Sequence, residues 1–87
     1  MILNIDNSNY EIDKMSPLAI DSETLKWEPI TIRLKTNLTA SDFKKVKILI
    51  IKGYSEYKDA EIVVDNEIMV SENTITIQDV SYCSILN

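Results

Sequence analysis

The β-branched residues constrain the fold of this chain more than any other feature of its sequence. Isoleucine, valine and threonine supply 25 of the 87 residues, and isoleucine alone supplies 14. Branching at Cβ restricts the side-chain rotamers, which lowers helix propensity and suits packing on a pleated sheet. The sequence therefore predicts a domain built mainly from β-strands.

Alternation of apolar and polar side chains marks the clearest strands. Pro29 has no amide hydrogen for a sheet and suits the start of a strand over residues 30–35. Residues 74–78 alternate in the same way. Residues 61–64 and 68–70 flank a short polar segment, a spacing that predicts a tight hairpin. We therefore expect an antiparallel β domain, a small sandwich or open barrel of about five to seven strands.

Only one segment carries a signal for helix. Thr39 can cap a helix with an acidic first turn, so we expect one short helix near residues 40–45. Residues 46–52 are then expected to form a strand buried on both faces, because most of their apolar side chains are β-branched. The alternative is an α+β fold with one helix over residues 40–52, packed on an antiparallel sheet.

The length of the chain predicts a single β-rich domain over residues 1–87. Residues 1–16 are a candidate N-terminal pairing arm, because Met1, Leu3 and Ile5 share one face of an extended chain. A core this small, with one cysteine and therefore no internal disulfide, is marginal alone. We accordingly expect a homo-oligomer or a protein partner.

The composition argues against catalysis. The chain contains no histidine, the usual general base near neutral pH and the commonest metal ligand. It has only one glycine, so a phosphate-binding loop cannot be built. Cys83 has no neighbouring base and is expected to be a small buried apolar residue. The sequence predicts a protein that is not an enzyme and uses no cofactor and no metal.

The charge of the chain limits its partners. A net charge of −5 lacks the broad positive surface needed for direct nucleic-acid binding. No basic leader precedes a long apolar run, and no run is long enough to cross a bilayer, so we expect neither a signal peptide nor a membrane contact. The abundance of lysine, isoleucine and asparagine is typical of AT-rich genomes. The expected location is the cytoplasm of a low-GC bacterial host or a virion.

Aromatic residues in irregular segments, together with acidic residues around the expected hairpin, are the candidate interface. Exposed aromatic side chains are common anchors at protein interfaces, and acidic groups favour a basic partner. The candidate residues are Trp27, Tyr54, Glu56, Tyr57, Asp59, Glu61, Asp65, Glu67 and Glu72. A bound small molecule is not expected.

Two functions fit these features. The first is a non-catalytic interaction or assembly module, such as a small structural or adaptor subunit of a phage or mobile element. The alternative is a small acidic inhibitor that occupies the nucleic-acid-binding groove of a host defence or nucleic-acid-processing protein. Binding by such an inhibitor would weaken steeply with salt.

Overall fold

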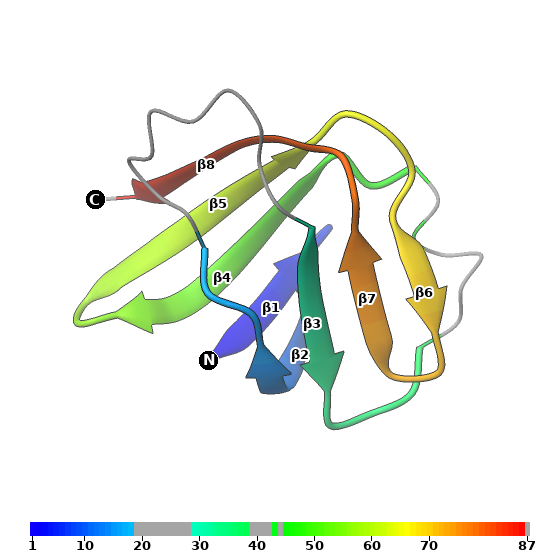
Figure 1. Ribbon diagram of the computed structural model, residues 1–87. Helices are drawn as coiled ribbons and strands as arrows, with labels where there is room; N and C mark the ends of the chain where they lie inside the picture. The colour runs from blue at the N-terminus through cyan, green and yellow to red at the C-terminus, as the bar shows by residue number, and fades with distance from the viewer. Residues whose placement is uncertain (19–28, 39–42, 44, 87) are drawn as a thin grey trace.

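The computed structural model describes residues 1–18, 29–38, 43 and 45–86, and within them the chain forms eight antiparallel strands (Figure 1). The strands are β1 (Ile2–Ile5), β2 (Ser8–Met15), β3 (Ile30–Leu34), β4 (Ile48–Ser55), β5 (Lys58–Val64), β6 (Met69–Ser71), β7 (Thr74–Ile77) and β8 (Val80–Leu86). They form one open sheet in the order β6-β7-β3-β2-β1-β4-β5-β8. The predicted mainly β fold is confirmed, with more strands than expected and no helix among the described residues.

The sheet folds over a single core. We call β1, β4, β5 and β8 the first half-sheet and β2, β3, β7 and β6 the second half-sheet, and in Figure 1 their strands run obliquely to each other. Strand β2 joins the halves, because its first residues pair with β1 and its last residues pair with β3. The register shifts between Ile12 and Lys14, and such a bulge bends a strand. The two halves therefore face each other across one set of buried side chains.

The core draws on nearly every strand. Its largest fully buried side chains are Leu3, Ile32, Leu34, Leu49, Ile51, Ile62, Ile75 and Ile77. Tyr10 packs beside it and meets Phe43 edge to face, with ring centroids 5.9 Å apart. Every buried residue of the described chain is apolar, so burial of isoleucine and leucine is the main stabilising term.

The amino-terminal segment lies in the middle of the sheet. Strand β1 pairs with β2 on one side and with β4 on the other. The β1–β2 hairpin turns at Asp6 and Asn7, whose φ angles of 48° and 68° are those of a tight turn that suits the twist of the strands. The candidate pairing arm over residues 1–16 is thus placed inside the sheet, where both sides of β1 bond to strands of its own chain.

The strand expected after Pro29 is confirmed. In β3 the side chains of Ile30, Ile32 and Leu34 are buried, and the side chains between them are exposed. The helix expected near residues 40–45 cannot be compared, because residues 39–42 and 44 lie outside the described residues.

The alternative helix over residues 40–52 is wrong, because β4 begins at Ile48 and pairs with both β1 and β5. The strand expected over residues 46–52 is confirmed from Ile48 onward. Its burial on both faces is not observed, because Leu49 and Ile51 enter the core while 52% of Ile48 remains exposed.

The predicted hairpin between residues 61–64 and 68–70 is wrong. Strand β5 pairs with β4 and β8, whereas β6 pairs only with β7 in the other half-sheet. The intervening residues cross between the halves and are held to the chain before β8, since Asp65 N donates to Asp79 O at 2.9 Å and Asn66 Nδ2 donates to Asp79 Oδ2 at 2.9 Å.

The hairpin partner of β5 is β4. The chain reverses between these strands at Glu56 and Tyr57, and Tyr57 adopts a φ of 59°. A bulge before the turn places Gly53 at a φ of 73°, a left-handed conformation that favours glycine. The segment expected to be a polar loop is therefore the end of one long hairpin.

Candidate protein interaction surface

An apolar row crosses the outer surface of the first half-sheet. In the register of the sheet, Ile48 lies opposite Val63, and Val63 lies opposite Tyr82. Their sequence neighbours Leu49 and Ile62 point into the core, so these three side chains point away from it. Ile48 and Tyr82 are each 52% exposed, and Val63 is half-buried between them. We call Ile48, Val63 and Tyr82 the outer row.

Mixed residues border the outer row. The next row of the same surface contains Asn4, Ile50, Glu61 and Ser84. Ile50 is half-buried and widens the apolar area, while Glu61 introduces a charge at its margin. An apolar centre with a polar rim is the usual arrangement at protein interfaces.

The outer surface of the second half-sheet is mainly polar by contrast, although Met69 of edge strand β6, opposite Thr76, is 57% exposed. Thr31 lies opposite Thr76, and Arg33 lies between Lys14 and Thr74. Threonine methyl groups and charged side chains suit an exposed sheet surface that needs no cover. The difference between the two outer surfaces makes the first half-sheet the candidate surface for a partner.

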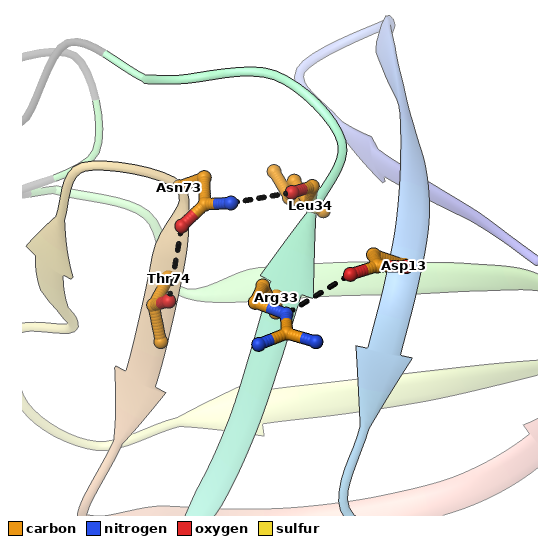
Figure 2. A network of polar contacts seen from close by, with 5 residues as sticks. All are labelled: Asp13, Arg33, Leu34, Asn73 and Thr74. Carbon is orange, nitrogen blue, oxygen red and sulfur yellow. Dashed lines mark hydrogen bonds and ion pairs between the residues drawn. The ribbon is translucent and has the colours of Figure 1, made fainter.

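Polar contacts fix the second half-sheet internally. Figure 2 shows Arg33 Nε donating to Asp13 Oδ2 at 3.0 Å, between β3 and β2. In the same view Asn73 Nδ2 donates to Leu34 O at 2.9 Å, and Thr74 Oγ1 donates to Asn73 Oδ1 at 3.3 Å. These contacts hold the end of β3 against the turn before β7, which gives them a structural role.

A shallow hollow of about 260 Å³ lies on this polar surface. It is lined by Lys14, Met15, Ser16, Thr31, Arg33 and Thr74. The Arg33 guanidinium is already paired with Asp13, and the lining holds neither a carboxylate nor a thiol. The Ser16 hydroxyl also lines the hollow, and it accepts a hydrogen bond from Thr31 N at 3.0 Å.

The predicted aromatic anchors separate in the structure. Trp27 lies outside the described residues. Tyr54 is half-buried against the core, and its hydroxyl accepts a hydrogen bond from Leu18 N at 3.2 Å. Tyr57 is fully exposed in the β4–β5 turn beside Glu56. Tyr54 thus covers the core, and Tyr57 is the member of the pair that is free to meet a partner.

The predicted acidic residues lie in three places. Asp59 and Glu61 are on β5, where Asp59 Oδ1 accepts a hydrogen bond from Gly53 N at 3.0 Å. Asp65 and Glu67 are in the connection between the half-sheets. Glu72 is in the β6–β7 turn, with a φ of 54°. Among these acids, the register places Glu61 in the row beside the outer row.

Sequence reasoning missed the outer row itself. Ile48 was expected to be buried with the rest of residues 46–52, Val63 was interpreted as part of a hairpin strand, and Tyr82 was not among the candidate interface residues. The available signal was that apolar side chains occupy both faces of β4, while one domain of this length has few elements to cover a second face.

Burial raises the pKa of the nearby Cys83 thiol to about 11, so this thiol is protonated at neutral pH.

Within the residues that the structure describes, no three histidine, cysteine, aspartate or glutamate side chains gather as a metal site. The same part of the chain contains no helix of sufficient length and apolar character to span a membrane. No protein-family model, curated protein or solved structure matches this chain.

The hydroxyl of Tyr54 is expected to contribute to stability. Replacing Tyr54 with phenylalanine leaves the Leu18 amide without its partner and should lower the free energy of unfolding by about 1 kcal/mol. Urea denaturation measures the change. Tyr57→Phe is the matched control, because that side chain is fully exposed and its variant should unfold like the wild type. Equal stability of Tyr54→Phe and the wild type would contradict the structural role of this contact.

Proposed function

We propose that this protein is a non-catalytic interaction or assembly module that docks on another protein through the outer row. The observation that carries the proposal is an apolar row across three strands of the first half-sheet, with Ile48 and Tyr82 each half exposed. A structural or adaptor subunit of a phage or mobile element is the proposed setting, in keeping with the small size and lysine-rich, AT-type composition.

The energetics of the outer row favour docking. Removing apolar surface from water contributes about 25 cal/mol per Å², and exposed isoleucine and tyrosine side chains carry much of that surface. Strand pairing fixes the backbone of Ile48 and Tyr82, so little backbone entropy is lost when a partner covers them. A flat apolar row on a sheet therefore suits a partner with a complementary apolar surface.

Replacing Ile48 with glutamate is expected to abolish partner capture without unfolding the protein. Its side chain is 52% exposed, so the charge stays in water in the free protein but is buried in a complex. Affinity purification from the source cell, followed by mass spectrometry, should recover a partner with the wild type and lose it with Ile48→Glu. A melting temperature close to that of the wild type would confirm that the variant is folded.

The control for this experiment is Tyr57→Ser, which alters the most exposed aromatic side chain at a turn away from the outer row. This variant should capture the partner as the wild type does. Capture that survives Ile48→Glu and fails with Tyr57→Ser would move the interface to the β4–β5 turn. Absence of any partner for the wild type would refute docking on another protein.

Salt dependence separates the proposal from the acidic inhibitor. Docking through apolar side chains changes little with ionic strength, whereas an inhibitor of a nucleic-acid-binding groove depends on charge. Repeating the capture at low and high salt, with and without competing DNA, distinguishes the two. Loss of binding at high salt together with competition by DNA would favour the inhibitor.

A further inference from the structure

The two edges of the sheet are unequal. Edge strand β6 has three residues and lies between Glu67 and Glu72. Edge strand β8 has seven residues, Val80–Leu86, with no charged side chain and no proline. Short strands and flanking charges are the usual protection of a sheet edge against pairing with another chain. Strand β8 is long, and the charged residue beside it is Asp79, whose carboxylate accepts a hydrogen bond from Asn66 Nδ2. In the part of the chain that the structure describes, no strand pairs with the outer side of β8.

The register shows which residues of β8 direct their peptide groups to the open edge of the sheet. Val64 N donates to Lys47 O on the β4 side of β5, so the alternating ladder turns the peptide groups of Val63 and Glu61 towards β8. Tyr82 and Ser84, which lie opposite Val63 and Glu61, therefore direct their peptide groups towards β5. Cys83 and Ile85, which alternate with them, direct their peptide groups to the open edge.

We propose that a second copy of this chain pairs with this edge, so that the two β8 strands run antiparallel about a two-fold axis at Ser84. In this register Cys83 of each copy faces Ile85 of the other, and a hydrogen-bonded pair of this kind exchanges two backbone bonds. On the outer surface Tyr82 faces Leu86 of the second copy. Both pairs are apolar, and the central pair is serine with serine.

Charge favours a second copy as the occupant despite the net charge of −5. No charged residue lies on β8, so the two edges meet without opposed like charges. The nearest acid on the adjoining strand is Glu61 on β5, opposite Ser84. In the pair, the two Glu61 residues are three strand spacings apart, about 14 Å, which exceeds the screening length at physiological salt.

The pairing goes beyond the proposed docking surface, because it depends on the backbone of β8. It also extends that surface, since Tyr82 is at once the end of the outer row and a member of the new strand pair. Both outer rows would then lie on one sheet that spans both copies, and each would be extended across the two-fold axis by Leu86 of the other copy. A symmetric partner or a repeated assembly suits such a surface.

Charge substitutions at Ser84 test the register. Ser84→Lys and Ser84→Glu each place two like charges opposite each other at the two-fold axis, and each should raise the dimer dissociation constant about fivefold or more. Sedimentation velocity over a concentration series measures this constant. Mixing the two variants should restore a dimer, because lysine then faces glutamate. Ser55→Lys, at an exposed position on β4, which β5 separates from the edge strand, should dimerise like the wild type.

A backbone substitution tests the edge independently. Ile85→Pro removes an amide that points to the open edge and should raise the dissociation constant about tenfold or more, because each copy loses one intermolecular bond. Circular dichroism checks that Ile85→Pro is folded. If Ile85→Pro is unfolded, the effect of Ser84→Lys on the dimer dissociation constant tests the edge pairing.

Two outcomes would overturn the inference. The first is a wild type that stays monomeric at millimolar concentration, and the second is a dimer unaffected by Ser84→Lys. In the second case, loss of the dimer with Ile48→Glu would place self-association on the outer row and leave the proposed docking surface intact. A dimer sensitive at Ser84, with partner capture insensitive to Ile48→Glu, would support the edge pairing and refute the proposed docking surface.

Discussion

Replacing Ile32 with alanine is expected to lower the free energy of unfolding by about 2–5 kcal/mol, the range for truncating a large buried aliphatic side chain. Ile32 has no exposed surface and lies in β3, opposite Met15 of β2 and Ile75 of β7. Small domains have a total stability of about 5–15 kcal/mol, so this single change removes much of it. Urea denaturation monitored by circular dichroism measures the loss.

Thr31→Ala is the control in the same strand. Thr31 is exposed and lies opposite Thr76, so its truncation should cost less than about 1 kcal/mol. If the two variants lost equal stability, β3 would not contribute its apolar face to the core. The comparison therefore tests the inward direction of Ile32 as well as its burial.

The inward face of β3 was predictable because every local signal agreed. Pro29 marked the start, and strict alternation assigned Ile30, Ile32 and Leu34 to the core. The same alternation placed Ile75 and Ile77 correctly in β7. A period of two residues determines which face is buried, whatever strand lies next to it.

Strand pairing was less predictable, because more than one segment of the chain could form the hairpin turn next to β5. The segment Asp65–Asn66–Glu67 has the composition of a hairpin turn, yet it crosses between the half-sheets. The true reversal before β5 is at Glu56 and Tyr57, and tyrosine rarely adopts the positive φ found there. The longer ladder that β5 makes with β4 and β8 outweighs the local preference of the other turn.

The candidate surface was the least predictable feature. Apolar residues on both faces of β4 indicate a buried strand, and only the three-dimensional structure shows that the face with Ile48 has no cover among the described residues. Tyr82 lies on β8, which follows β7 in the chain but lies at the opposite edge of the sheet. Local pattern assigns side chains to a face, but topology decides what lies over that face.

Stability is expected to fall between about pH 9 and pH 11 because of Cys83. Burial raises the pKa of this thiol from its ordinary value of 9.0 to about 11, and the side chain is only 3% exposed. In this window the unfolded chain has lost the thiol proton while the folded chain retains it, so rising pH favours unfolding. The loss should be about 2–3 kcal/mol, complete above the folded pKa and absent below the unfolded pKa.

Cys83→Ala isolates this contribution. Every other titratable group is present in both proteins, so the difference between the two pH profiles reports the thiol alone. Urea denaturation at intervals from pH 7 to pH 11.5 should show the wild-type advantage shrinking as pH rises through the window. Parallel pH profiles of the two proteins would contradict burial of the thiol. A thiol reagent at pH 8 gives a second test, because the protonated and buried sulfur of the folded wild type should react slowly. Rapid labelling would also contradict burial. Because Cys83 directs its side chain into the core and its peptide group to the open edge, a variant that keeps the backbone while removing the sulfur should retain the dimer.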